Sequence, residues 1–312
     1  MDKILEIKNL SVGFNIEDNF YYALNNINIS FEKGKIHAIA GESGCGKSVL
    51  INTILKLLPK NGIIKNGEIN FQNKNLINLK EKDFKKIRGN KISLIPQDPF
   101  MSLNPLYTIE NQLMEIPILK NNKDSKNIIR KSLEEVKIKN IETVLKSYPH
   151  ELSGGMKQRV IISMALISNS ELILADEPTT ALDVTVSNSI LNLLLELKEK
   201  GKTIILITHD LSIVSNYCDT CTIMYLGNIV ENAATNDIFK QPKHPYTKAL
   251  LNALPTLKGK KLENIKGQIS PITEKIEGCK FHPRCNFAME ICKLNKPELK
   301  NVDNSSCACF LY

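Results

Sequence analysis

The sequence predicts an α/β fold in which a largely parallel sheet is covered by helices. Three observations lead to this prediction. A glycine-rich stretch at residues 41–48 lies between the apolar run 36–40 and a segment with helical spacing. From residue 153 onward, helical and strand-like apolar patterns alternate, which is typical of a parallel sheet. The chain has 312 residues, of which 42% are hydrophobic and 24% charged, and this is enough to bury a large core.

The N-terminal half is expected to contain strands and a polar helical insert. Alternating apolar residues predict half-exposed strands, and Pro59 with the Asn61-Gly62 turn marks the end of the first helix. The predicted elements are strands at 4–14, 27–31 and 36–40, a helix at 49–58, strands at 67–71 and 91–95, and an inserted helical subdomain over about 99–160.

The C-terminal half is expected to complete the sheet and then to change character. The predicted elements are a helix from 153, a strand at 172–175, a helix at 186–199, a strand at 203–207, a further helix and a strand at 222–226. Beyond residue 232 the composition shifts to proline, lysine and asparagine with a cysteine cluster. We therefore expect a first domain at 1–232 and a C-terminal extension at 233–312.

Composition limits the possible roles of the chain. The net charge is +8, but the lysines are scattered among polar and acidic residues, so a nucleic-acid surface is not indicated. No apolar run approaches the roughly 18 residues that span a bilayer, and an export signal is not recognisable. We expect a cytosolic protein, in which eight cysteines suit metal ligation or burial better than disulfide formation.

The glycine-rich stretch has the residues of a phosphate-binding loop. Glycines let the backbone approach phosphate oxygens, and the start of the following helix adds positive potential. Lys47 can reach the terminal phosphates, and Ser48 can ligate Mg²⁺. An ordinary glycine-rich turn is the alternative, but a lysine and a serine at a helix start argue against it. The predicted nucleotide-binding residues here are Gly41, Glu42, Ser43, Gly44, Cys45, Gly46, Lys47 and Ser48.

Two carboxylates follow the apolar strand at 172–175. Strand ends of this kind form the ligand-binding edge of a parallel sheet. Asp176 is suited to hold Mg²⁺ through water, and Glu177 is suited to orient and deprotonate the water that attacks the γ-phosphorus. Without the phosphate loop, an acid pair capping a helix ahead of Pro178 would be the first interpretation.

Between these motifs, the run Ser153-Gly154-Gly155 opens a helix. A serine hydroxyl and helix N–H groups can form a second anion site, whereas an ordinary capped helix is the alternative. With this run the chain resembles the ATP-binding cassette (ABC) family, whose signature it matches. The resemblance implies a P-loop NTPase fold with a mixed sheet core, an antiparallel β subdomain, a helical subdomain and a small cysteine-rich C-terminal extension.

The resemblance extends over most of the first 230 residues. Gln97 matches the glutamine that contacts Mg²⁺, the attacking water and the membrane partner, and His209 matches the histidine that contacts the γ-phosphate. Asp183 matches the loop that crosses the interface between two cassettes. Phe14 falls where the family stacks an aromatic ring on adenine, although the tyrosines at 21–22 compete. Each of these residues alone could have an ordinary loop or core role. The resemblance rests on finding all of them in the order in which the family has them.

Further segments look like the importers for peptides and nickel. These segments are 88–89, 97–99, 102–105, 244–250 and 279–285. The resemblance implies an ATP-hydrolysing subunit that powers import of di- or oligopeptides. The same role for nickel or another chelated metal is an alternative. A soluble ABC ATPase acting on nucleic acid or ribosomes fits less well, because the chain has one cassette without coiled-coil or zinc insertions.

Members of this family work in pairs that sandwich two nucleotides. The resemblance therefore implies a second ABC ATPase subunit, a non-identical paralogue, together with two membrane permease subunits and, indirectly, an extracellular substrate-binding protein. No nucleic-acid partner is expected. The implied cofactors are ATP and Mg²⁺, the latter at Ser48, Gln97 and Asp176. The implied location is the cytoplasmic face of a bacterial membrane.

The remaining motif is the cysteine cluster of the tail, formed by Cys279, Cys285, Cys292, Cys307 and Cys309. Thiolates in a short, loop-rich segment suit a soft metal, which would act as a staple. In the family this element carries a [4Fe–4S] cluster, and the resemblance makes Cys309 the better fourth ligand and Cys307 the alternate. Zinc and unliganded thiols are alternatives. A separate C-x-x-C pair at apolar positions is expected to be buried and not redox-active: Cys218 and Cys221.

Overall fold

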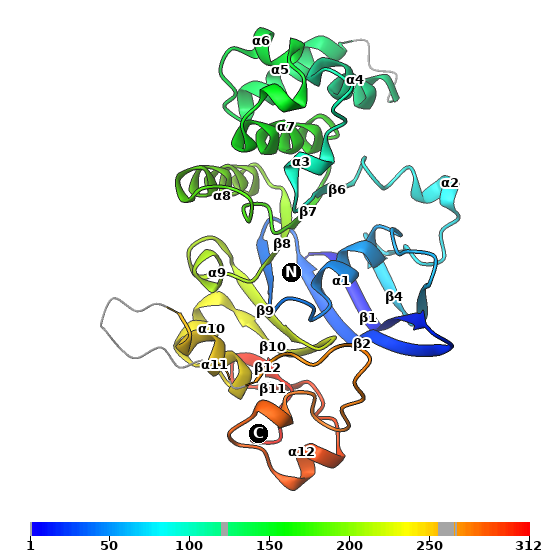
Figure 1. The fold of residues 1–312 in the computed structure, drawn as a ribbon, viewed down its shortest axis with the longest axis vertical. Coiled ribbons are helices and arrows are strands. Elements are labelled where there is room, and N and C mark those ends of the chain that lie inside the picture. The colour runs from blue at the N-terminus through cyan, green and yellow to red at the C-terminus, as the bar shows by residue number, and fades with distance from the viewer. Residues whose placement is uncertain (1, 120–123, 255–264, 266) are drawn as a thin grey trace. The chain divides into compact units, whose positions relative to one another are not determined.

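The computed structural model describes residues 2–119, 124–254, 265 and 267–312. The chain forms two compact units (Figure 1). Unit 1 combines Met1–Asn78 with Ile207–Tyr312, and unit 2 is Leu79–Leu206. Unit 2 is therefore inserted between two segments that fold together. In the described part of the chain, no helix combines the length and the apolar character that crossing a membrane requires.

Unit 1 contains an antiparallel sheet with the strand order β2-β1-β4-β5. Alternating apolar residues form it as predicted, and Ile7 and Ile29 pair across β1 and β2. β2 and β4 are longer than the strands predicted at 27–31 and 67–71. The two-residue turn Glu17–Asp18 has positive φ values at both positions, as in a type I′ hairpin turn. The strands are β1 (Lys3–Ile16), β2 (Asn19–Glu32), β4 (Gly62–Phe71) and β5 (Lys74–Asn75).

The other strands of unit 1 follow the order β11-β12-β10-β9-β3. β3 is buried along its whole length and pairs in parallel with β9, whereas β9 and β10 are antiparallel, so the sheet is mixed. β10 and the two tail strands were not expected from the sequence. Their bounds are β3 (Ile36–Ala40), β9 (Thr220–Tyr225), β10 (Asn228–Ala234), β11 (Lys300–Val302) and β12 (Ser305–Cys307).

Helix α1 (Lys47–Ile54) is shorter than the predicted helix at 49–58. Leu55 still has helical dihedral angles, but Lys56 adopts φ 53°, and this left-handed conformation ends the helix before Pro59. The expectation that helical spacing would continue to residue 58 is therefore wrong. The apolar residues at 57 and 58 belong to the turn that leads into β4.

Three aromatic rings form the centre of the C-terminal part of unit 1. Tyr225 lies 4.7 Å from Tyr246 and 5.2 Å from Phe281, measured between ring centroids. The ring of Phe281 is buried, so the tail is anchored in the core of unit 1. The helices of this part are α9 (Leu211–Tyr217), α10 (Thr235–Lys240), α11 (Pro245–Asn252), a 3₁₀ turn η2 (His282–Arg284) and α12 (Glu290–Leu294).

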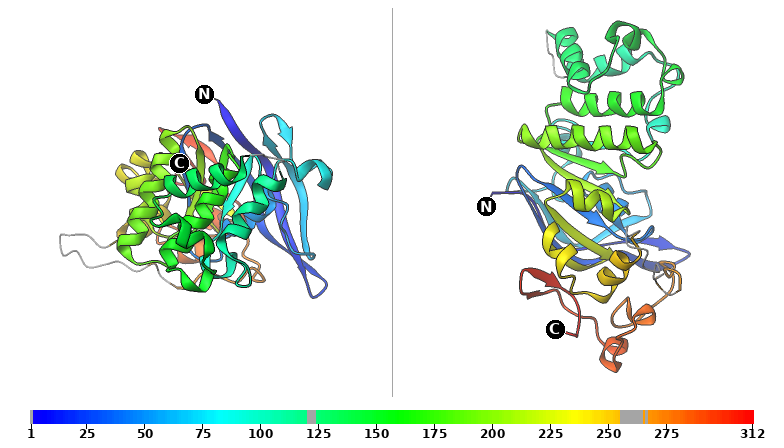
Figure 2. Two further views of the ribbon diagram at one scale, coloured as in Figure 1. Left: turned by 90° about the horizontal axis from the view of Figure 1, so that it is seen from above. Right: turned by 90° about the vertical axis from the view of Figure 1, so that its left-hand side faces the viewer.

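Unit 2 contains a parallel strand pair and the helical insert. The predicted strands at 91–95 and 172–175 form β6 (Ile92–Ile95) and β7 (Leu172–Asp176), which pair in parallel with each other. Helix α7 (Gly154–Ile167) runs beside α8 (Val184–Glu199), as Figure 1 and the right panel of Figure 2 show. β8 (Thr203–Thr208) carries the chain from unit 2 back to unit 1. The other helices are α2 (Glu81–Phe84), α3 (Pro99–Ser102), α4 (Ile109–Leu119), α5 (Ser125–Glu135), α6 (Ile141–Lys146) and η1 (Pro149–Glu151). The predicted insert is thus helical in its described residues.

Candidate nucleotide-binding site

The glycine-rich loop in unit 1 joins β3 to α1, the arrangement that the sequence predicts. Two of its glycines cannot be replaced without displacing backbone. A Cβ on Gly41 would lie 2.3 Å from the carbonyl oxygen of Met224, and one on Gly46 would lie 2.7 Å from that of Ala23. Gly46 also has φ 107° and precedes the helix. The sequence therefore specifies a tight loop whose N–H groups lead into a helix N-terminus, the geometry that binds phosphate.

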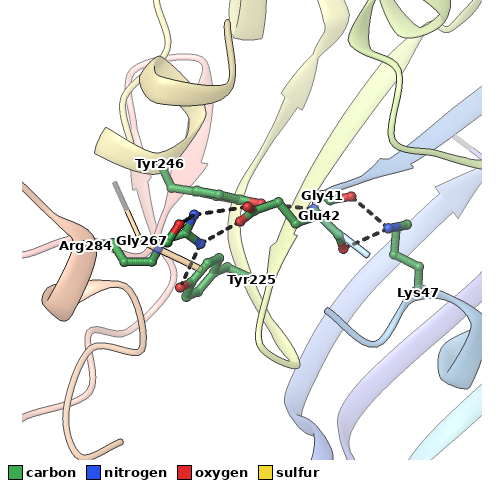
Figure 3. A network of polar contacts seen from close by, with 7 residues as sticks. All are labelled: Gly41, Glu42, Lys47, Tyr225, Tyr246, Gly267 and Arg284. Atoms are coloured by element: carbon green, nitrogen blue, oxygen red, sulfur yellow. Dashed lines mark hydrogen bonds and ion pairs between the residues drawn. The ribbon is translucent and has the colours of Figure 1, made fainter. Parts of the chain in front are cut away.

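The ammonium group of Lys47 lies inside this loop. Its side chain is buried, and Nζ donates to the carbonyl oxygens of Gly41 at 2.7 Å and Glu42 at 3.1 Å (Figure 3). The Cys45 thiol is also buried, and burial raises its pKa. The carbonyl of Cys45 accepts a hydrogen bond from Gly227 N–H at 2.8 Å, so this residue contributes to the loop through its backbone. Ser43, Gly44 and Ser48 are exposed on the same loop and the first turn of α1.

Glu42 connects this loop to the C-terminal extension. Its two carboxylate oxygens accept hydrogen bonds from both terminal nitrogens of Arg284, at 2.7 and 3.0 Å (Figure 3). Its N–H donates to the hydroxyl of Tyr246 at 3.0 Å. Sequence reasoning did not assign Arg284 or Tyr246 to the nucleotide site. The only signal was that both lie in segments, 244–250 and 279–285, whose sequences resembled one branch of a family.

In unit 2, the second carboxylate after β7 is held by two donors. Glu177 Oε2 accepts hydrogen bonds from the side-chain amide of Gln97 at 3.1 Å and from the hydroxyl of Thr180 at 3.0 Å. Glu177 has φ 44°, a conformation that costs energy for a residue other than glycine. The structure therefore brings together two predicted residues, Gln97 and Glu177, and adds Thr180. Asp176, at the end of β7, is half-buried.

The serine-glycine run and Asp183 both occupy helix starts in unit 2. Ser153 caps α7 by accepting from Met156 N–H at 3.3 Å, and Asp183 caps α8 by accepting from Val186 N–H at 2.9 Å. A Cβ on Gly155 would lie 2.6 Å from a methyl group of Val186, so the two helices approach closely there. Both residues therefore act as ordinary helix N-caps. The first two residues of α7 are glycines, Gly154 and Gly155.

Two predicted residues remain in unit 1. His209 follows β8 directly and is exposed. Phe14 lies in β1, is half-buried, and is paired with Tyr21 of β2 in the sheet register. A partly exposed aromatic ring on a strand can stack on a nucleobase. Because Tyr21 is half-buried like Phe14, burial does not distinguish between these two candidates.

All eight cysteines are free thiols. Burial is the main cause that raises the pKa of Cys279 to about 11, and the neighbouring thiols Cys292, Cys309 and Cys285 contribute in the same direction. Across the described residues, no three His, Cys, Asp or Glu side chains are arranged to hold a metal ion. Cys307 differs from the four, because it lies buried in β12 opposite Glu231 of β10. Of the C-x-x-C pair, Cys221 is buried as expected, whereas Cys218 is only half-buried.

Comparison with known proteins assigns the chain to a family. Residues 24–180 match the model described as ABC transporter, and residues 230–292 match the model described as oligopeptide/dipeptide transporter, C-terminal region. The chain is 41% identical over 320 residues to the oligopeptide transport ATP-binding protein AppD of Bacillus subtilis, spanning 100% of this chain and 98% of the relative. It is 42% identical over 315 residues to the oligopeptide transport ATP-binding protein OppD of Escherichia coli, spanning 99% and 93%.

Solved structures give the same result. The dimeric post-hydrolysis structure of the ATP-binding cassette MJ0796, bound to ADP and Pi, matches with a TM-score of 0.66 and 29% identity over 74% of this chain and 98% of that one. The chain therefore belongs to the ABC transporter family of ATP-binding cassettes. Its activity is that of an ABC ATPase, and the predicted cassette fold, with a mixed sheet, an antiparallel sheet and a helical part, is confirmed.

Proposed function

We propose that this chain is the ATP-hydrolysing subunit that powers import of di- or oligopeptides through a membrane ABC transporter. The observation that carries the proposal is the combination of a cassette with the C-terminal region found in oligopeptide and dipeptide transporters. Its relatives of nearly equal length are named as oligopeptide transport ATP-binding proteins. The peptide itself is captured elsewhere in such an assembly, so this chain supplies energy rather than selectivity.

ATP binding is proposed to begin at the phosphate loop. Backbone N–H groups of residues 43–48 and the Lys47 ammonium offset the charge of the phosphates, while Phe14 stacks on adenine. The hydroxyl of Ser48, the amide oxygen of Gln97 and the carboxylate of Asp176 are oxygen donors of the kind that Mg²⁺ prefers. Mg²⁺ held by these donors would supply positive charge to offset the charge on the phosphate oxygens.

Hydrolysis is assigned to Glu177 as the general base. Its carboxylate orients the attacking water and takes its proton, while Gln97 and Thr180 hold Oε2 in place through the two hydrogen bonds described above. His209 is proposed to contact the γ-phosphate. The products are ADP and inorganic phosphate, and most of the catalysis comes from positioning and electrostatics.

The partners are part of the same proposal. Ser153, Gly154 and Gly155 would cover the γ-phosphate held by a second cassette, with Asp183 crossing the interface between the two. We propose a paralogous ATPase as that second cassette, two membrane permeases contacted through the Gln97 loop and the helical insert, and a substrate-binding protein outside the cell. The chain would then be peripheral to the cytoplasmic face of the membrane. We propose that the ATP-binding domain ends at residue 232 and that the C-terminal extension begins there. The two parts share one sheet, because β12 of the extension pairs with β10.

A soft-metal centre in the extension is a further part of the proposal. Its support is the donor set, four thiols at 279, 285, 292 and 309 in one short tail, where Cys279 N–H donates to the Cys292 carbonyl at 2.8 Å; a [4Fe–4S] cluster or zinc is the proposed group. When bound, the metal would cross-link the tail. Iron, acid-labile sulfide and zinc are measured after anaerobic purification of the full chain. Cys309→Ala should lose the metal and Cys307→Ala should keep it, whereas a parent chain with neither metal overturns this part.

The transport proposal is tested with the assembled complex in membrane vesicles. ATP-dependent uptake of a labelled tripeptide should require this chain and should stop in the Glu177→Gln variant, while uptake of a free amino acid by other carriers stays unchanged. Peptide uptake that continues without this chain, or uptake of chelated nickel but not of peptide, would contradict the proposed substrate.

A further inference from the structure

An ion pair between Glu42 and Arg284 joins the phosphate loop to the C-terminal extension, and it is more buried than a typical surface ion pair. The Arg284 side chain is 7% exposed and that of Glu42 is 28% exposed, and the pair has the bidentate geometry of the strongest charge-assisted hydrogen bonds. Arg284 makes further contacts with the Tyr225 hydroxyl and the Gly267 carbonyl, both at 3.3 Å (Figure 3). A pair of this kind holds both of its partners in one place.

Glu42 needs such a partner because of where it lies. It is the second residue of a loop built to receive several negative charges, and its own carboxylate would repel them if it were left unpaired. Arg284 cancels this charge. The hydroxyl of the buried Tyr246, which accepts from Glu42 N–H, fixes the backbone at the same residue. Charge and conformation of the loop are therefore set together by two residues of the extension.

Arg284 is itself held by the cysteine segment. It is the last residue of η2, which lies between Cys279 and Cys285. The carbonyl of Cys279 accepts from the backbone N–H of His282 at 3.0 Å, and Cys285 N–H donates to the carbonyl of His282 at 3.2 Å. The turn carrying Arg284 is thus hydrogen-bonded to both cysteines. A shift of the backbone at these two cysteines would therefore shift the turn that carries the Arg284 side chain.

We propose that Arg284 is a positioning residue of the nucleotide site, neutralising and orienting Glu42, and that it makes ATP affinity depend on the state of the cysteine segment. This inference rests on the proposed function, because it presumes that the loop binds ATP. The extension then has a role in the energy-supplying reaction itself, besides any role in anchoring the tail.

ATP affinity is measured by equilibrium titration of the full purified chain with a fluorescent ATP analogue. If the parent chain does not bind ATP, that result contradicts the proposed function rather than the role of Arg284. Arg284→Ala should weaken binding by about tenfold. Adding Glu42→Gln to it should restore affinity to within about threefold of the parent, because the uncompensated charge is gone. Parent-like affinity in a folded Arg284→Ala variant, or failure of the second change to restore it, overturns the proposal.

Further variants separate positioning from folding. Glu42→Gln alone leaves the positive charge of Arg284 uncompensated beside the loop, so ATP affinity should rise. A fall in affinity would contradict the charge argument even if Arg284→Ala does not fold. Arg284→Lys keeps the positive charge but cannot donate two parallel hydrogen bonds to the Glu42 carboxylate. The affinity of this variant for ATP should therefore lie between those of Arg284→Ala and the parent. In the assembled transporter, the Arg284→Ala change should appear in KM for ATP and leave kcat within about threefold. A loss confined to kcat would contradict the assignment.

The link to the thiols is tested by a double-mutant cycle. Cys285→Ala should weaken ATP binding in the parent background, and it should add less than about twofold when Arg284 is already alanine. Circular dichroism at each step confirms that the variants are folded. Additive effects of the two changes would mean that the cysteine segment does not act through Arg284.

Discussion

The side-chain amide of Gln97 donates a hydrogen bond to Glu177 Oε2 over 3.1 Å, joining the residues that follow two neighbouring parallel strands. β6 ends at Ile95 and β7 ends at Asp176, so both side chains leave the same edge of the strand pair. Thr180 donates to the same oxygen. One oxygen of the proposed general base is thereby occupied by two donors, which fixes the direction of the other.

Glu177→Gln should leave ATP binding intact and lower turnover by at least about 100-fold, because an amide cannot take a proton from water. Binding is measured by titration and turnover by phosphate release. Glu134→Gln, an exposed carboxylate of the same unit, is the control and should turn over normally. Normal turnover in the Glu177 variant would remove it from the base role.

Gln97→Ala and Thr180→Val each remove one donor to Oε2. Each should lower turnover by about tenfold, because the carboxylate stays but is less well oriented. Thr180→Val should leave ATP affinity nearly unchanged, whereas Gln97→Ala should also weaken binding of ATP with Mg²⁺, because its amide oxygen is a proposed ligand of that ion. The double variant tests whether the donors act on one group. Losses that simply multiply would mean that the two donors act independently of each other, rather than jointly on one carboxylate oxygen.

Lys47→Ala should weaken ATP binding by about 10- to 100-fold, since a buried ammonium that can bond phosphate oxygens is lost. An equilibrium binding titration measures the effect. Lys60→Ala, an exposed lysine of the same unit, should bind like the parent. Equal affinity in the two variants would exclude Lys47 from phosphate binding.

His244 makes stability depend on pH. Burial lowers its pKa from 6.5 to about 3, and its Nδ1 accepts from Tyr246 N–H, which requires the neutral ring. Between these values the unfolded chain takes up the proton first, so stability is lost as the pH falls below 6.5, by about 1.4 kcal/mol per pH unit. Burial also lowers the pKa of His37, which adds a loss in the same direction.

His244→Asn keeps a side-chain acceptor at the start of α11 and removes the titrating group. In urea unfolding between pH 4.5 and 7.5, the free energy of unfolding of this variant should therefore depend less on pH. The contribution of His37 to the pH dependence should remain. An unchanged slope would show that His244 does not stay neutral in the folded chain.

Phe281→Ala should destabilise unit 1 by about 3–5 kcal/mol, because its buried ring fills the space between Tyr225 and Tyr246. Thermal or urea unfolding measures the change. Phe287 is 59% exposed on the same tail, and Phe287→Ala should change stability by less than about 0.5 kcal/mol. Similar effects of the two changes would contradict the anchoring role.

Local pattern was enough to predict the buried strands β3 and β7 and the start of α7, whereas α1 and α8 each begin two residues before the predicted start. β3 and β7 are continuous apolar runs, and the residues before α7 and α8, Ser153 and Asp183, are strong N-caps. The turns could not be predicted in the same way. Glu17–Asp18 and Leu226–Gly227 both have positive φ at two positions, but neither pair is a usual hairpin signal, so β10 and the full length of β2 were missed.

The contact between Arg284 and Glu42 was also beyond prediction. The two residues are 242 positions apart, and no periodic pattern relates them. The same holds for Thr180, whose role depends on the turn that follows β7 rather than on its own type. Sequence motifs identify which elements carry the chemistry, whereas the residues that hold those elements in place depend on tertiary packing.

The pairing of β12 with β10 has a practical consequence for handling this protein. Three residues, 305–307, cover the free edge of a strand that is otherwise mostly buried. Removing them would leave a row of backbone donors and acceptors open to any other extended chain, which is the usual route to self-association. A purification tag or cleavage site is therefore better placed at the other end of the molecule.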